Sequence, residues 1–136
     1  MCFDIREYRI QQLLLIDDDE TYILALKVFL KHEGYHAKIV TTVAEARKVI
    51  KQEELLLICS DLDLPDGSDM DLLTAVRIAD QRIPFLLVSN HEIGDYETEA
   101  MQKGATLCLE KMKVSIVKEK ILEYAVRSQK LQKDYR

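Results

Sequence analysis

The sequence predicts one α/β domain, a doubly wound five-stranded parallel sheet with helices on both faces. Its 136 residues are enough for a single domain with a buried core. Five short apolar runs alternate with segments of helical periodicity, the order that gives parallel strands joined by right-handed helical crossovers. Several runs have no polar residues between the apolar ones, as expected for strands that helices cover on both faces.

The predicted strands are the five apolar runs Leu13–Ile16, Ala37–Val40, Leu55–Cys59, Phe85–Val88 and Leu107–Leu109. An apolar stripe at helical spacing predicts the first helix, and its members are Tyr22, Leu26, Phe29 and Leu30. Gly34 follows at a position where a positive φ commonly ends a helix. Thr42 and Glu45 have the spacing of a capping box, which opens the second helix.

The last three helices are predicted by their ends. Ser68 and Asp71 repeat the capping cue before the third helix. The first turn of a short fourth helix is acidic, with Asp95, Glu97 and Glu99, and Gly104 ends it. The fifth helix begins near Val114 and has a basic outer face. It loses its apolar stripe beyond about Ser128, where we expect the chain to fray.

Composition excludes several classes of protein. The chain carries 19 basic and 24 acidic side chains, a net charge of −5, which argues against electrostatic binding of nucleic acid or anionic lipid by the whole domain. The basic residues gather in 111–136, which we interpret as a solvated helix face rather than a partner-binding surface. Three cysteines cannot form a closed disulfide set, and no signal peptide or membrane span is present. We therefore expect a cytoplasmic protein.

Polar residues follow the predicted strands at the edge where parallel sheets bind ligands. They are Asp17, Asp18 and Asp19 after the first strand, Asp61 and Asp63 after the third, Ser89 after the fourth and Lys111 after the fifth. Two carboxylates about 5 Å apart repel by about 3 kcal/mol at an effective dielectric near 20. Mg²⁺ would balance that charge, and a lysine suits a phosphoryl group. Carboxylates, a divalent cation, a lysine and a hydroxyl in one place are typical of sites of phosphoryl transfer.

Four stretches, in this order along the chain, resemble the receiver domain of two-component response regulators. They are Leu-Leu-Leu-Ile-Asp-Asp-Asp at 13–19, Ser-Asp-Leu-Asp-Leu-Pro-Asp-Gly at 60–67, Val-Ser at 88–89, and Lys111. Together they are specific, although each alone is weak. The resemblance covers about residues 12–128 and implies a flavodoxin-like (βα)5 fold with strand order 2-1-3-4-5. We expect residues 1–136 to form this single domain, with flexible ends.

The resemblance also implies roles for single residues. Asp61 is expected to be the phosphoacceptor, which takes a phosphoryl group from a phosphohistidine of a sensor histidine kinase or phosphotransfer protein. Mg²⁺ is the expected cofactor, held by Asp17, Asp18, Asp61 and the backbone carbonyl of Asp63. Ser89 and Lys111 are expected to bind the phosphoryl oxygens. Slow hydrolysis of its own acyl phosphate is the only enzyme activity expected.

The expected output is a shift between two pre-existing states. It involves the surface of the fourth helix, fifth strand and fifth helix, which would contact a downstream effector protein or domain. A homodimer is compatible with this interpretation. Direct contact of this domain with nucleic acid or membrane is not expected. The chain is either a stand-alone regulator or the receiver part of a longer one.

Two other functions stay open. Asp61-Leu-Asp63 after an apolar strand resembles the nucleophile and general acid of haloacid-dehalogenase-type phosphatases, although it lies at the third strand and that family's later paired carboxylates are missing. The second alternative is a receiver-like interaction module that works without phosphorylation. Structural roles also remain for several residues: Asp19 as a helix N-cap, Asp66 as a turn residue, and the three histidines as surface or loop residues.

Four residues depart from the usual receiver pattern. Met112 follows Lys111 where a proline with a cis peptide bond is usual. A trans bond at this position would change the direction of the Lys111 side chain. Cys108 replaces the aromatic that normally moves with the hydroxyl residue, so we expect a weak or altered switch. Asn90 replaces a small residue and is expected to narrow access to Asp61. Asp69 replaces a frequent glycine, and we expect little harm because aspartate tolerates left-handed geometry.

Overall fold

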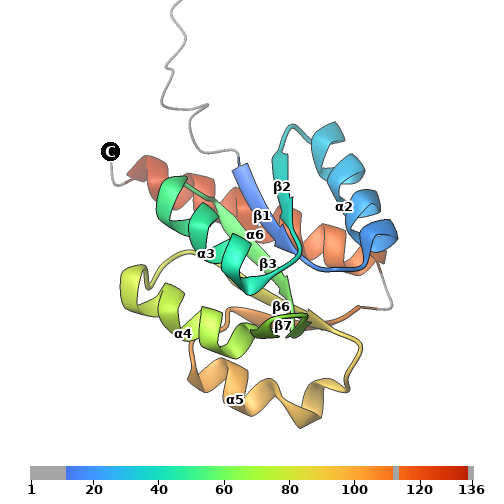
Figure 1. Ribbon diagram of the computed structural model, residues 1–136. Helices are drawn as coiled ribbons and strands as arrows, with labels where there is room; N and C mark the ends of the chain where they lie inside the picture. The colour runs from blue at the N-terminus through green and yellow to red at the C-terminus, as the bar shows by residue number, and fades with distance from the viewer. Residues whose placement is uncertain (1–11, 112–113, 135–136) are drawn as a thin grey trace, which may run out of the picture.

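The computed structural model describes residues 12–111 and 114–134. Its central sheet has five parallel strands in the order β2-β1-β3-β6-β7 (Figure 1). The strands are β1 (Gln12–Ile16), β2 (His36–Val40), β3 (Leu57–Asp61), β6 (Phe85–Ser89) and β7 (Leu107–Glu110). The helices are α2 (Glu20–His32), α3 (Val43–Gln52), α4 (Asp69–Ala79), the 3-10 turn η1 (Ile93–Asp95), α5 (Glu97–Gln102) and α6 (Val114–Asp134). The predicted class and strand order are confirmed.

Two apolar layers hold the helices to the sheet. On one face α3 and α4 cover side chains such as Leu14, Ile58 and Leu87. On the other face α2 and α6 cover Leu15, Cys59 and Leu86. Alternate residues of each strand therefore enter opposite layers, which is why the central strands read as unbroken apolar runs. Figure 1 shows α3 and α4 on one side of the sheet, with α2 and α6 on the other.

The predicted helix signals were largely right. Thr42 is the N-cap of α3, and its side chain accepts a hydrogen bond from the backbone N–H of Glu45. Gly34 and Gly104 have φ values of 89° and 105° after α2 and α5, conformations that favour glycine. A Cβ atom at Gly104 would also lie 2.7 Å from Cγ of Arg77. This glycine therefore serves close packing as well as the turn.

Several details of the prediction were wrong. Phe29 is 44% exposed and is no part of the core stripe, which runs through Ile23, Leu26 and Leu30. The sequence also did not reveal a small hairpin of β4 (Asp63–Leu64) and β5 (Gly67–Ser68). The predicted start of the third helix was right, because α4 begins at Asp69, directly after Ser68.

The predicted fraying beyond Ser128 was also wrong, since α6 continues to Asp134. Ser128 itself is buried, and the hydroxyl of Tyr35 donates a 2.8 Å hydrogen bond to Gln129. This contact ties the last turns of α6 to the loop after α2. None of the helices in the described part of the chain combines the length and the apolar character that a membrane-spanning helix requires.

Candidate functional site

The predicted site residues meet at the carboxyl edge of the sheet. Asp17 and Asp18 follow β1, Asp61 is the last residue of β3, Ser89 is the last residue of β6, and Lys111 follows β7. Backbone hydrogen bonds fix these strand ends: the N–H of Asp17 donates to Val40, and the N–H of Lys111 donates to Ser89, at 3.1 and 3.0 Å. Parallel strands end at one edge, so residues far apart in the chain become neighbours.

Lys111 is the centre of the arrangement. Its Nζ atom lies 2.9 Å from both carboxylate oxygens of Asp17. The same atom lies 3.5 Å from Oδ2 of Asp61 and 3.9 Å from Oδ2 of Asp19. The lysine side chain is only 6% exposed, so these charges interact where water screens them poorly. The ammonium therefore balances several carboxylates at once, with Asp17 as its closest partner.

Three carboxylates form a group that can hold a metal ion. Asp17, Asp18 and Asp61 each offer one oxygen, and these oxygens all lie within 4.8 Å of one another. Asp17 is buried, Asp61 is half-buried and Asp18 is exposed. A hard divalent cation such as Mg²⁺ takes oxygen ligands and keeps some water. The buried side of this carboxylate group supplies protein ligands, and its exposed side leaves room for water ligands, which is the coordination that Mg²⁺ prefers.

Burial and the charges of the site shift the pKa values of Asp61 and Lys111. Burial raises the pKa of Asp61, and the negative charge of Asp17 raises it further, while Lys111 opposes both. Burial alone would lower the pKa of Lys111, but its hydrogen bond to Asp17 and the charges of Asp17, Asp61 and Asp19 raise it. Asp61 is thus a carboxylate whose negative charge is incompletely balanced, and Lys111 stays charged.

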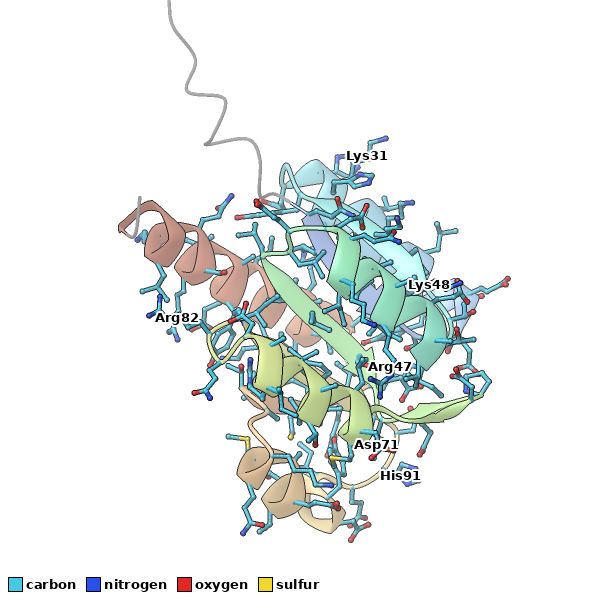
Figure 2. All side chains as sticks on the ribbon, turned by 60° about the vertical axis from the view of Figure 1, so that its left-hand side comes forward. Lys31, Arg47, Lys48, Asp71, Arg82 and His91 are labelled. Carbon is cyan, nitrogen blue, oxygen red and sulfur yellow. The ribbon has the colours of Figure 1, made fainter. Side chains whose placement is uncertain are left out.

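Ser89 and Asp63 have different surroundings from those of the central group. The Ser89 side chain is buried, and its oxygen accepts a 3.0 Å hydrogen bond from the backbone N–H of His91. The Asp63 carboxylate shares a hydrogen bond with Nε2 of the His91 ring, on the exposed side of the site. Figure 2 shows His91 toward the end of the molecule where α4 begins. His91, expected to be an unremarkable surface residue, therefore links two strand ends of the site.

Tyr22 was predicted only as a core residue, but it also borders the site. Its ring centroid lies 5.0 Å from Nζ of Lys111. Burial raises the pKa of its hydroxyl, with further contributions from Cys59 and from the carboxylates of Asp17, Asp61 and Asp19. Helical spacing placed Tyr22 on the inner face of α2 correctly. Helical spacing could not reveal that the Tyr22 ring lies beside Lys111, which follows β7.

Two nearby aspartates cap helices. Asp19 is the N-cap of α2, as predicted, and accepts a hydrogen bond from the N–H of Tyr22 at 3.3 Å. Asp66 does more than occupy a turn: its two oxygens accept hydrogen bonds from the N–H groups of Val43 and Ala44, at 2.7 and 3.0 Å. The β4–β5 hairpin is thereby fastened to the start of α3.

The structure places three of the four residues that depart from the receiver pattern. Cys108 is buried on β7, and Asn90 is exposed after β6. Asp69 begins α4, and no described residue other than glycine has a positive φ, so left-handed geometry at Asp69 is not needed. Met112 and the form of its peptide bond lie outside the described residues.

Comparisons with known proteins agree with this geometry. The family model of the response regulator receiver domain matches residues 13–122. The phosphoglycerate transport system transcriptional regulatory protein PgtA of Salmonella typhimurium is 32% identical over 99 residues, covering 73% of this chain and 24% of that protein. The cell cycle transcriptional regulator CtrA of Caulobacter vibrioides is 30% identical over 94 residues, covering 69% and 41%. The matched region thus spans less than half the length of these relatives.

Solved structures show the same architecture. The beryllofluoride-activated NtrC4 receiver domain dimer is similar with a TM-score of 0.80 and 26% identity, covering 88% of this chain and 98% of that one. A CheY-like receiver domain protein of Methanospirillum hungatei has a TM-score of 0.81 at 24% identity, covering 89% and 98%. At that identity the second likeness supports the fold alone.

Proposed function

The chain belongs to the response regulator receiver family, and on this premise we propose that it is a phosphorylation switch with Asp61 as its phosphoacceptor. In this family, phosphorylation of an aspartate is the known mechanism. The observation that carries the assignment is the cluster in which Asp17, Asp18 and Asp61 place oxygens within 4.8 Å of one another beside the ammonium of Lys111. An interaction module that works without phosphorylation has no need of that combination.

The donor set fits Mg²⁺. The three carboxylates supply hard oxygen ligands, and Lys111 alone cannot balance their charge. We propose that Asp17, Asp18, Asp61 and the backbone carbonyl of Asp63 hold the ion. When bound, it supplies positive charge that favours the approach of an anionic phosphoryl group.

The reaction we propose is a transfer of one phosphoryl group to Asp61. A carboxylate oxygen of Asp61 attacks phosphorus, a new O–P bond forms, and the bond between phosphorus and the donor breaks. The donor, a phosphohistidine imidazole or a small acyl phosphate, leaves with the electron pair. Lys111, 3.5 Å from Asp61, then pairs with a phosphoryl oxygen. The oxygen of Ser89 accepts a hydrogen bond from His91, and the described residues offer its hydroxyl proton no acceptor, so that proton can be donated to the phosphoryl group.

The wider role follows from family membership. Receiver domains of this family act with kinase or phosphotransfer partners and with effector domains. We propose a sensor histidine kinase or phosphotransfer protein as donor, a downstream effector that reads α5, β7 and α6, and a cytoplasmic setting where such partners meet. We also propose that the whole chain forms one domain, which can pair as a homodimer. Cys108 on β7 is too small to replace the aromatic side chain that usually moves together with the hydroxyl residue. The conformational change is therefore transmitted by other residues.

The first experiment is phosphorylation by a small donor. We expect acetyl phosphate with Mg²⁺ to add one phosphoryl group, measured by intact mass, and to move amide signals near β3, β6 and β7. The Asp61→Asn variant and addition of a chelator should each abolish the change. A wild-type protein that keeps its mass and spectrum, and does not respond to beryllofluoride with Mg²⁺, would favour the module that works without phosphorylation.

An Asp63→Asn variant separates the switch from a phosphatase. A receiver uses only the backbone carbonyl of Asp63, so this variant should still accept one phosphoryl group. A haloacid-dehalogenase-type phosphatase would turn over a small phosphate ester continuously and lose that turnover in Asp63→Asn, because the general acid would be gone. Sustained turnover by the wild type would overturn the proposed switch.

A further inference from the structure

Tyr22 places an aromatic face beside the lysine of the site. The ring, on α2, has its centroid 5.0 Å from Nζ of Lys111, within the range in which the face of an aromatic ring attracts a cation. Asp17 and Asp61 hold the same ammonium at 2.9 and 3.5 Å. The ammonium therefore interacts with anionic oxygens and with one uncharged ring.

The hydroxyl of Tyr22 takes no part in hydrogen bonding with the described residues. Its oxygen is buried and has no hydrogen-bond partner among them. A buried hydroxyl without a partner costs stability, so a hydrogen bond does not explain its position. What Tyr22 contributes to the site is the ring, and the ring acts on Lys111.

An uncharged contact can limit the motion of the Lys111 side chain. Its side chain has a flexible four-carbon stem and a point charge that can follow any nearby anion. Asp17 is both its closest partner and one of the three candidate metal ligands. A cation bound by Asp17 would weaken the ion pair with Lys111, whereas the attraction of the ring does not depend on the state of any carboxylate. The ring can thus hold the ammonium near Asp61 in both states.

We propose that Tyr22 is a positioning residue that keeps the ammonium of Lys111 beside Asp61 through the face of its ring. This inference rests on the proposed function of the site and adds a residue to it. It requires an aromatic ring at position 22 and no hydroxyl. Tyr22→Phe keeps the ring, and Tyr22→Leu removes it while leaving an apolar side chain on α2.

The first test needs neither metal nor phosphoryl group. The side-chain ammonium signal of Lys111 is measured by nitrogen NMR on the full chain, together with its exchange with water. Tyr22→Phe should leave the exchange rate unchanged, and Tyr22→Leu should raise it by about threefold or more, because the ammonium is held less firmly. Equal rates in the wild type and Tyr22→Leu would overturn the proposal, and so would equal rises in both variants.

The second test measures the dissociation constant for beryllofluoride in the presence of Mg²⁺ by calorimetry. We expect binding about three- to tenfold weaker in Tyr22→Leu and unchanged in Tyr22→Phe. In a Lys111→Met background the substitution Tyr22→Leu should have no further effect. Tyr124→Leu is the matched control, because Arg127 lies 5.0 Å from that ring on α6, outside the site, and should leave binding unchanged.

Failure of the two proposals is distinguishable. A wild-type protein that binds no beryllofluoride contradicts the phosphorylation switch, and the ammonium exchange still decides the role of Tyr22. A further loss from Tyr22→Leu in the Lys111→Met background means that the ring acts elsewhere, which overturns the proposal. If Lys111→Met does not fold, the comparison of Tyr22→Phe with Tyr22→Leu decides the role of the ring in both measurements.

Discussion

Lys111 is bound more closely to Asp17 than to Asp61. Its Nζ atom lies 2.9 Å from both oxygens of Asp17 and 3.5 Å from Oδ2 of Asp61. Asp17 is also one of the three carboxylates that can hold a metal ion. The lysine and a bound cation therefore compete for the negative charge of the same residue.

This competition predicts how Lys111→Met responds to Mg²⁺. Removing one partner of a buried charge cluster leaves the other charges unbalanced, so we expect the free energy of unfolding to fall by about 3–5 kcal/mol. Mg²⁺ should restore part of the loss and bind more tightly than to the wild type, since it neutralises the same carboxylates. At a hundredfold excess over its dissociation constant it adds about 2.7 kcal/mol. Urea unfolding with Mg²⁺ or with chelator measures both effects.

Lys103→Met is the control for that experiment. Lys103 pairs with Glu99 at 3.0 Å on the exposed surface of α5, and such pairs contribute about 0–1 kcal/mol. Its loss should change stability little and leave the Mg²⁺ response as in the wild type. Equal Mg²⁺ stabilisation of the wild type and Lys111→Met would contradict the competition.

Asp61→Asn is expected to stabilise the metal-free protein at neutral pH. The pKa of Asp61 is raised above 3.8 by burial and by Asp17, so the folded state binds the proton more readily than the unfolded state does. Wild-type stability therefore gains as pH falls through the raised pKa toward 3.8. The difference in stability between Asp61→Asn and the wild type should be largest at pH values above the raised pKa, and it should shrink as the pH falls from that pKa toward 3.8. Thermal unfolding across pH measures this, and an advantage independent of pH would contradict it.

Asp66 predicts the opposite dependence. Hydrogen bonds from the N–H groups of Val43 and Ala44 hold the pKa of Asp66 below its usual value. Its stabilising contribution is therefore complete above the unfolded pKa and is lost as pH falls through the lowered folded pKa. Asp66→Ala should lower the unfolding temperature at neutral pH, with a difference that narrows in acid. In Asp66→Asn the amide oxygen can still accept one hydrogen bond, so a smaller loss is expected.

Tyr22→Phe should raise the free energy of unfolding by about 1 kcal/mol, because it removes a buried hydroxyl that lacks a partner among the described residues. Tyr35→Phe is the matched comparison, since the Tyr35 hydroxyl donates to Gln129 at 2.8 Å. Its removal should lower stability by about 1 kcal/mol. Chemical unfolding of the two variants should therefore move the midpoint in opposite directions, and a loss in Tyr22→Phe would show that its hydroxyl is satisfied.

The sequence predicted most of the fold because its signals are local. Apolar runs marked the five strands of the sheet, and Thr42 and Gly34 marked helix ends through hydrogen bonding and backbone sterics. The β4–β5 hairpin escaped notice because each of its strands has two residues, too few for a period. Phe29 was misplaced because a helical stripe fixes a face only to within about one residue.

The residues gathered in the site were also predicted in part. Strand ends of a parallel sheet share one edge, so Asp17, Asp18, Asp61 and Lys111 could be placed together from their register alone. The roles of Tyr22, His91 and Asp66 could not, because each depends on a contact between elements far apart in the chain. His91 meets Asp63 across 28 residues and Asp66 meets Val43 across 23.

The sequence by itself determined the order of strands and helices along the chain, and the edge of the sheet at which the charged residues collect. Only the tertiary structure decided how those charges are shared. Asp17 takes the closer contact with Lys111, the Tyr22 ring lies over the ammonium, and Asp61 keeps a raised pKa. Periodicity and register follow from backbone geometry, whereas charge sharing depends on side-chain distances of a few ångströms and on burial.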